Sequence, residues 1–226
     1  MYKILSVGGS IIIPKTGFDV SFLKKFRKLI LDQVKNGDKF ILIVGGGGTA
    51  RQYQDALRGV HKISDSDLDW IGIYATRFNA EMVRLMFAQY AYKEVVCDPN
   101  TKLKTNKKII VCAGEKPGQS TDTVAVKLAK NFGSRQVFNL SNIDYAYDKD
   151  PAKFKNARRI EQMPWSDFRK IVGSKWTPGF SAPFDPIASA AAQKMGLEVA
   201  IINGTNLPNL KRALGQKSFK GSLIHP

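Results

Sequence analysis

The amino-acid sequence predicts an α/β protein with a mainly parallel sheet that helices cover on both faces. The main observation is that short apolar, strand-like runs alternate with helical periodicity along all 226 residues. A second observation is that several of these runs end in glycine-bearing turns, at the strand ends where ligands bind in such folds. The composition, with 43% hydrophobic and 24% charged residues, excludes a collagen, a coiled coil and a disordered protein.

The N-terminal half alternates regularly between the two kinds of element. Its helix after Asp19 places Phe26 and Ile30 on one face. The expected elements are, in order, a strand at 2–7, a helix from Asp19 to Asn36, a strand at 39–44, a helix from Thr49, a long helix from Asp65 to about Tyr92, and strands at 95–97 and 109–112. The apolar stripe expected on the long helix consists of Ile71, Ala75, Phe78, Met82, Leu85 and Met86.

The C-terminal half continues the alternation. Asp185 and Pro186 are expected to open a helix, because Asp is a favoured N-cap and Pro is favoured at the first helical position. The expected elements are a helix at 121–132, a strand at 136–140, a turn-rich loop at 142–151, a helix at 165–171, a Gly/Ser/Pro-rich loop at 173–183, the helix after Asp185, a strand at 198–202, a helix at 207–214 and a strand at 222–224.

The charge balance indicates a polyanionic ligand. The chain has 35 Lys and Arg against 19 Asp and Glu, a formal net charge of +16, which attracts nucleic acid, acidic membranes or phosphorylated small molecules. The basic residues are spread along the chain, without five consecutive like charges or a basic tail, which disfavours nucleic acid as a partner. We interpret most of this charge as solvated surface and some of it as directed at phosphate.

The sequence predicts a cytoplasmic protein without a membrane partner. Its apolar runs are far too short to span a bilayer, and its first residues lack the apolar segment of a signal peptide. Cys97 and Cys112 have no metal-ligand spacing and lie in apolar runs, which favours buried, reduced thiols.

Glycine clusters follow three of the strand-like runs, at 8–9, 45–48 and 114–118. Glycines let successive backbone N–H groups approach an anion, and a helix N-terminus adds a favourable partial charge. One such cluster could be a tight turn that binds nothing, whereas three at neighbouring strand ends favour a ligand with several phosphates. The P-loop pattern is absent, which excludes the P-loop NTPases.

A dinucleotide-binding interpretation of the second cluster is weak. The run 45–50 matches the loose pattern G-x-G-x-x-A, and acidic residues follow about 20 positions later. These residues, Asp65, Asp67 and Asp69, stand at the start of an expected helix rather than at the end of a strand, where a ribose would be bound.

Motifs in a fixed order cover essentially the whole chain: Val7-Gly8-Gly9-Ser10, Val44-Gly45-Gly46-Gly47 with Ala50-Arg51, Asp69-x-Ile71-Gly72-Ile73-x-x-Thr76-Arg77-x-Asn79-Ala80, Pro117-Gly118-x-x-Thr121-Asp122, Asn142-x-Asp144-x-x-Tyr147-x-x-Asp150-Pro151, Asp185-Pro186-Ile187-Ala188 and Gly221-Ser222-x-Ile224. Together they resemble the amino-acid-kinase superfamily and, within it, the UMP kinases of the archaeal type. The resemblance implies a three-layer α/β/α sandwich. It also implies one domain, 1–226, with the phosphate acceptor in about 1–120 and ATP in about 121–226.

The resemblance also implies which residues bind the substrates. ATP would be bound by Gly8, Gly9, Ser10, Gly47, Arg51, Ser141, Asn142, Tyr147 and Asp150. UMP would be bound by Gly46, Asp69, Glu115, Lys116, Pro117, Gly118, Gln119, Ser120 and Thr121. Asp122 resembles the aspartate that orients the catalytic groups in this family, and Arg51 and Lys116 would join it in catalysis.

The implied reaction transfers the γ-phosphoryl group of ATP to UMP in pyrimidine nucleotide biosynthesis. A nucleoside monophosphate is already an oxyanion, so the transfer needs alignment and positive charge rather than a general base. Mg²⁺ would be bound mainly through the ATP phosphates, and we assign it no protein ligand. The resemblance further implies a hexamer, a trimer of dimers, assembled through apolar helix faces near 65–92.

The sequence departs from the family pattern at a few positions. Ser6 stands at a position that is often Lys, Gly48 replaces a usual Lys, and Tyr145 occupies a position that is commonly Gly, where a positive φ would be unfavourable. Glu115 and Lys116 replace a Thr-His pair in the acceptor loop. Lys116 could supply phosphate charge in compensation, and Lys220 is a weaker candidate.

Two alternatives stay open at this point. One is another small-phosphate kinase of the superfamily, such as an isopentenyl phosphate kinase, although that family places a His after its second glycine loop, where this chain has Thr49-Ala50-Arg51. The other is a catalytically weak nucleotide-binding or regulatory protein, which the net charge and the departures from the family pattern would suit.

Overall fold

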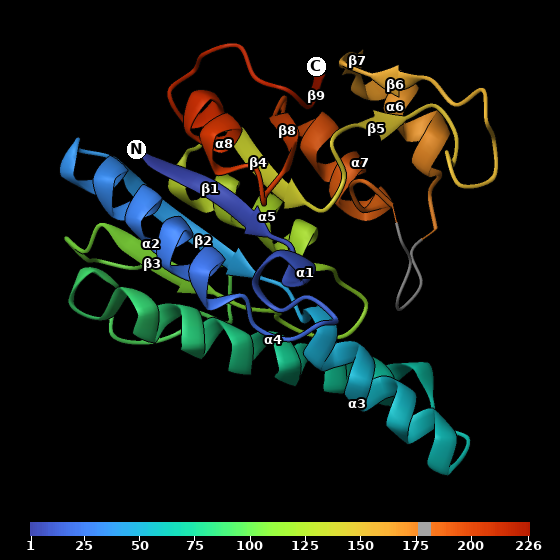
Figure 1. Ribbon diagram of the computed structural model, residues 1–226, viewed down its shortest axis with the longest axis horizontal. Coiled ribbons are helices and arrows are strands. Elements are labelled where there is room, and N and C mark those ends of the chain that lie inside the picture. Colours follow the sequence, from blue (N-terminus) through green and yellow to red (C-terminus); the bar gives the residue numbers. More distant parts are fainter. Residues whose placement is uncertain (176–181) are drawn as a thin grey trace.

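The structure is a computed structural model that describes residues 1–175 and 182–226. Its centre is a seven-stranded sheet with the order β3-β2-β1-β4-β8-β9-β7 (Figure 1). The strands are β1 (Tyr2–Val7), β2 (Lys39–Val44), β3 (Ile109–Cys112), β4 (Gln136–Ser141), β7 (Gln162–Pro164), β8 (Glu198–Asn203) and β9 (Ser222–His225). Neighbouring strands are parallel except for β8 and β9, which are antiparallel.

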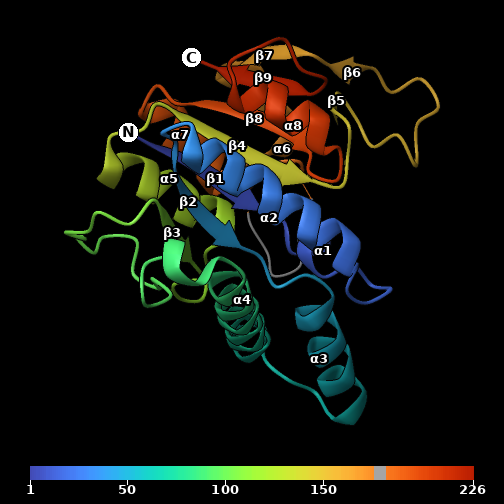
Figure 2. The same ribbon diagram turned by 60° about the vertical axis from the view of Figure 1, so that its left-hand side comes forward.

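Helices cover both faces of this sheet. One face packs against α2 (Val20–Lys35), α8 (Leu207–Leu214) and the C-terminal part of α4 (Asp65–Phe87), and the other against α5 (Thr121–Phe132), α6 (Trp165–Val172) and α7 (Pro186–Lys194). Figure 2 shows α2 and α8 in front of the sheet. All four residues of β3 are buried, as is typical of strands between two helical layers. The predicted α/β sandwich with a mainly parallel sheet is confirmed.

Two helices start at the glycine segments that follow the first two strands. The short α1 (Gly9–Ile12) follows β1, and α3 (Gly47–Val60) follows β2. Helix α3 packs against α4, and the two extend beyond the sheet (Figure 2). A 3-10 turn, η1 (Ala88–Tyr90), follows α4, and a small antiparallel pair, β5 (Ala146–Tyr147) and β6 (Arg159–Ile160), lies outside the main sheet.

The strand predicted at 95–97 is wrong. Only Val96 pairs there, through an isolated bridge to Cys112, and its N–H donates to Val111 O at 2.9 Å. The chain then turns away at Asp98-Pro99, because proline has no N–H to continue a ladder. Cys112 is buried and Cys97 half-buried, both as free thiols.

The apolar stripe predicted for α4 is correct only in part: Ala75 is buried and Met82 and Met86 pack against the core, but two other members are exposed. Phe78 and Leu85 are 74% and 59% exposed. The buried face consists of Leu68, Ile73, Ala75, Thr76, Asn79, Ala80, Val83 and Phe87. Two polar residues are buried on this face because they have hydrogen-bond partners in the glycine segments, described below. The helix ends at Phe87 rather than near Tyr92, and the next residue, Ala88, has a φ of +39°.

The other differences concern short elements and element ends. Helix α1 and strands β5, β6 and β7 were not expected, because elements of two to four residues show no periodicity. Helix α3 begins at Gly47 rather than Thr49. The predicted loop at 173–183 includes 176–181, which lie outside the described residues. Among the helices of the described ranges, none is both long and apolar enough to cross a membrane.

Candidate active site

The glycine segments after β1 and β2 meet at one edge of the sheet. The two strands are paired in register up to Val7 and Val44, so both chains leave the sheet at the same level. The backbones then touch: a Cβ on Gly45 would lie 2.6 Å from Gly9 N, and Gly47 has a φ of +57°. Side chains are therefore excluded here by the close approach of two backbones. The contact also places the N-termini of α1 and α3 next to each other, and the N–H of Gly48 in the first turn of α3 donates to Ile13 O.

Side chains of α4 hold the second glycine segment from the opposite side. The amide of Asn79 is buried and donates to both Gly45 O and Gly46 O at 2.9 Å. Thr49 donates to Asn79 Oδ1 at 3.3 Å. The bond to Gly45 O satisfies a carbonyl group of the glycine turn, and Gly46 O also accepts from Ala50 N at 3.1 Å. Asn79 lies within the sequence of α4, but an analysis based on apolar periodicity did not assign it to the buried face.

Asp122 forms the polar centre of this edge. Its Oδ1 accepts hydrogen bonds from Ser6 Oγ at 3.0 Å and from Asn139 Nδ2 at 3.1 Å, and its Oδ2 accepts from the backbone N–H of Asp185 at 3.3 Å. Two strands, β1 and β4, and the turn before α7 thus converge on one carboxylate of α5. Burial raises the pKa of Asp122 from 3.8 to about 6, and the nearby Asp185 adds to this, while the hydrogen bond from Ser6 opposes it.

The acceptor loop, defined here as 114–119, is anchored to α4. The N–H of Gly114 donates to Thr76 Oγ1 at 2.8 Å, and Arg77 Nη2 donates to Glu115 O at 2.9 Å. Further along, the N–H of Gly118 donates to Asp69 Oδ2 at 2.7 Å. Desolvation raises the pKa of Asp69, and the bond from Gly118 opposes that shift. The structure therefore brings Asp69 to the loop 114–119, with which the family resemblance groups it.

The loop ends at the start of α5. Ser120 is the N-cap and accepts from Thr123 N at 3.3 Å. This bond is the ordinary capping role that the sequence already allowed for Ser120. It places Thr121 in the first turn, directly before Asp122.

A cavity of about 570 Å³ lies beside the end of β4. Its lining includes the four residues expected on the adenosine side, Ser141, Asn142, Tyr147 and Asp150. Apolar side chains of α6 complete one wall, among them Ile171 and Val172. The end of β4 and strand β5 both border this cavity. The four residues therefore lie together although up to nine positions separate them in the sequence.

Three further residues predicted for the site, Arg51, Lys116 and Ser10, lie outside the contacts described so far. The Arg51 and Lys116 side chains are exposed, and no hydrogen bond or ion pair joins either to another part of the described chain. Ser10 lies in α1 and lines a separate hollow of about 530 Å³, together with Lys25 and Thr205. The backbone of Ser10 is thus at the glycine edge, while its side chain borders the α2–α8 side.

The departures from the family pattern have local explanations. Ser6 donates to Asp122, as described above. The N–H of Gly48 donates to Ile13 O at 3.0 Å, and a Cβ there would lie 3.1 Å from the same oxygen, so this position is crowded. Tyr145 does not have the positive φ that the sequence suggested. Two cationic groups lie over its ring: Arg159 Cζ is 5.2 Å and Lys220 Nζ is 5.9 Å from the ring centroid.

The residues at this edge fit a magnesium ion that ATP would bring. Mg²⁺ prefers oxygen ligands and is often held by one or two carboxylates and substrate phosphates. Asp122 and Asp185 supply carboxylates here, and Asp185 Oδ2 is buried without a hydrogen-bond partner in the described parts of the chain. Within those parts, no three His, Cys, Asp or Glu residues form a group able to hold a metal alone.

The fold is that of a known class of phosphotransferases. Residues 1–203 match the model of the amino acid kinase family, and the chain belongs to this family. Within the family, the chain is 32% identical to the uridylate kinase of Methanocorpusculum labreanum, over 98% of this chain and 94% of the relative. It is also 32% identical to the uridylate kinase of Methanococcus aeolicus, over 100% of both chains. The crystal structure of uridylate kinase from Archaeoglobus fulgidus matches with a TM-score of 0.84 and 27% identity, over 99% of this chain and 100% of that chain.

Proposed function

We propose that this chain transfers the γ-phosphoryl group of ATP to UMP, giving ADP and UDP. The observation that carries the proposal is the position of Asp122, in the first turn of α5 directly after the acceptor loop. There its carboxylate accepts hydrogen bonds from β1, from β4 and from the turn before α7. Similarity to uridylate kinases over the full length of the chain supports the same reaction. Isopentenyl phosphate kinase and a binding protein without turnover gain no support from these relatives.

The acceptor lies on the N-terminal side and ATP on the C-terminal side. Residues of 1–120 would hold UMP, through the loop 114–119 and Asp69, which accepts the Gly118 N–H. Residues of 121–226 would hold adenosine in the cavity at Tyr147 and Asp150. The adjacent N-termini of α1 and α3 would bind phosphate oxygens through first-turn N–H groups other than that of Gly48, which donates to Ile13 O.

The chain's own residues would act by alignment and charge. The UMP phosphate is an anionic nucleophile that needs no deprotonation, so the protein must hold donor and acceptor in line. Asp122, which accepts hydrogen bonds from Ser6 of β1 and Asn139 of β4, would orient the groups around the transferred phosphoryl group. The exposed Arg51 and Lys116 are available to neutralise phosphate charge, and Asp185 and Asp122 would face the magnesium ion. Bound Mg²⁺ would neutralise negative charge on the phosphates during transfer.

The test is direct identification of the product. The protein is incubated with Mg-ATP and UMP, and the nucleotides are separated by anion-exchange chromatography. We expect UDP and ADP in equal amounts, and neither product when UMP is omitted. ADP without UDP would indicate ATP hydrolysis and would refute the proposal.

A hexamer, as a trimer of dimers, and a cytoplasmic location are further parts of this proposal. Aromatic side chains of α3 and α4 support assembly: Tyr53, Tyr74 and Phe78 are exposed around an apolar groove of about 270 Å³. Light scattering with size-exclusion chromatography measures the mass. We expect six times 25.1 kDa for the native chain and a smaller species for Phe78→Lys. A monomeric native chain would contradict the assembly.

A further inference from the structure

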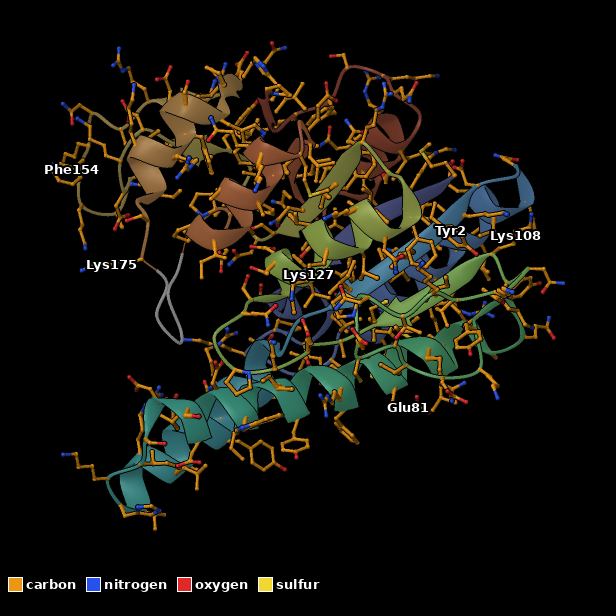
Figure 3. The ribbon with its side chains drawn as sticks, turned by 180° about the vertical axis from the view of Figure 1, so that it is seen from behind. Tyr2, Glu81, Lys108, Lys127, Phe154 and Lys175 are labelled. Carbon is orange, nitrogen blue, oxygen red and sulfur yellow. The ribbon has the colours of Figure 1, made fainter. Side chains whose placement is uncertain are left out.

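The acceptor loop is held from two sides by different kinds of contact. On the α4 side, Thr76, Arg77 and Asp69 bind backbone groups of the loop, as described above. On the α5 side, a single lysine binds its side chains. Lys127 Nζ donates to Glu115 Oε2 at 2.7 Å and also to Gln119 Oε1. Lys127 thus joins the beginning of the loop to its end, projecting from the side of α5 that faces α4 (Figure 3).

The ion pair is sheltered from solvent. The side chain of Glu115 is 16% exposed and that of Lys127 is 33% exposed. Exposed pairs contribute little because water and salt screen them, whereas loss of one partner of a sheltered pair leaves the other charge poorly solvated. Without Lys127, the Glu115 carboxylate would have to move out of the loop or remain unpaired in it.

The charge pattern of the loop gives this pair a consequence for substrate binding. Glu115 places a negative charge in a loop that is proposed to hold a phosphate ester, next to the positive charge of Lys116. Lys127 neutralises the charge of Glu115. Lys116 is exposed and has no ion-pair partner in the described residues, so it remains the loop's net positive charge.

We propose that Lys127 is a positioning residue for the acceptor: it closes the loop 114–119 and cancels Glu115, so that Lys116 can attract the UMP phosphate. Lys127 contacts the loop, and its effect on UMP is exerted through Glu115 and Gln119. The inference rests on the proposed UMP kinase activity and extends it to a residue outside the motifs that define the family resemblance.

The test compares Lys127→Met with Lys130→Met. Both lysines lie on α5, but Lys130 is exposed and has no ion pair in the described chain. For Lys127→Met we expect the KM for UMP to rise about tenfold, between the effects typical of exposed and of buried pairs. The kcat and the KM for ATP should stay within about twofold of the native values. For Lys130→Met, the kcat and both KM values should stay within the same range. An unchanged KM for UMP, or equal increases in both KM values, would refute the role.

Two further variants separate positioning from general loss of stability. Lys127→Arg keeps the charge and should restore the KM for UMP to within about threefold of the native value. The double variant Glu115→Gln with Lys127→Met removes the uncancelled carboxylate and should lower the KM relative to Lys127→Met alone. A double variant as impaired as the single one would show that Lys127 does not act through Glu115.

Hydrogen exchange without nucleotides provides a readout independent of activity. The amides of 114–119 should exchange faster in Lys127→Met and at the native rate in Lys130→Met. Native protection in both variants would overturn the proposal. If the native chain makes no UDP, the proposed function fails; if it makes UDP and Lys127→Met behaves like the native chain, only the positioning role fails.

Discussion

Replacing Asp122 by Asn should make the protein more stable at neutral pH while removing most of its activity. Asp122 is ionised at neutral pH although burial raises its pKa to about 6. The folded state therefore binds a proton at this carboxyl more tightly than the unfolded chain does. Ionisation consequently destabilises the folded state, and this effect grows as the pH rises from 3.8 through about 6.

The magnitude follows from the two pKa values. With 3.8 in the unfolded chain and about 6 in the folded one, ionisation destabilises the protein by about 3 kcal/mol at pH 7.5 and about 1 kcal/mol at pH 4.5. The amide introduced by Asp122→Asn does not titrate and has no such dependence. The variant loses the acceptor for the Asp185 N–H, which costs about 1 kcal/mol at every pH. The stability difference between variant and native protein should thus rise by about 2 kcal/mol from pH 4.5 to pH 7.5.

Urea unfolding of both proteins at the two pH values measures this difference. Groups that do not interact with Asp122 titrate alike in both proteins, so their contributions cancel. At pH 7.5 the variant should also show a kcat reduced about a hundredfold, in the range found for lost electrostatic stabilisation of a transition state. The native kcat should decline below about pH 6, as Asp122 becomes protonated. A stability difference that is equal at both pH values would refute the assignment of a half-buried, desolvated and ionised carboxylate at this position.

Three further variants test the rest of the site. Asp69→Asn should raise the KM for UMP about tenfold with little change in kcat, because it removes the charged acceptor of a loop amide; a normal KM in steady-state kinetics would contradict the acceptor position. Gly45→Ala places a Cβ 2.6 Å from Gly9 N and should lower the free energy of unfolding by about 3 kcal/mol, whereas Gly59→Ala, with open space around it, should not lower it. Tyr147→Ala should raise the KM for ATP at least about fivefold and leave that for UMP unchanged; the opposite pattern would reverse the two substrate sites.

The central strands were predictable because their sequences are apolar without interruption. Every residue from Phe40 to Val44 is buried in the structure, as expected for a strand covered on both faces. The capping of α7 was equally clear: Asp185 accepts from Ala188 N at 2.8 Å, and Pro186 is the first helical residue. Local chemistry determined both features, so the sequence was sufficient.

Helix α4 shows what periodicity could not supply. Its apolar residues suggested a stripe through Phe78, yet the core side includes Thr76 and Asn79. These polar residues can be buried because distant carbonyl and N–H groups of the glycine segments bind them. An apolar residue on the opposite side is then left exposed. Such an exchange depends on partners that are remote in sequence, which no local pattern encodes.

The candidate site divides in the same way. Glycines after the strands marked its edge, since only glycine permits two backbones to approach as Gly9 and Gly45 do. The surroundings of Asp122 were not predictable, because Ser6 and Asn139 reach it only through the pairing of β1 with β4. Lys127 was missed for a related reason: its two partners lie in the preceding loop, and a lysine on a helix is usually solvated.

The most direct test of the account is the kcat/KM of ADP release with Mg-ATP and each of four acceptors: UMP, CMP, dTMP and isopentenyl phosphate. We predict a strong preference for UMP, by about a hundredfold or more over isopentenyl phosphate, since a site that binds the ribose and base loses those contacts with a smaller acceptor. A preference for another acceptor, or no ADP release from a folded protein that binds ATP, would contradict the central claim.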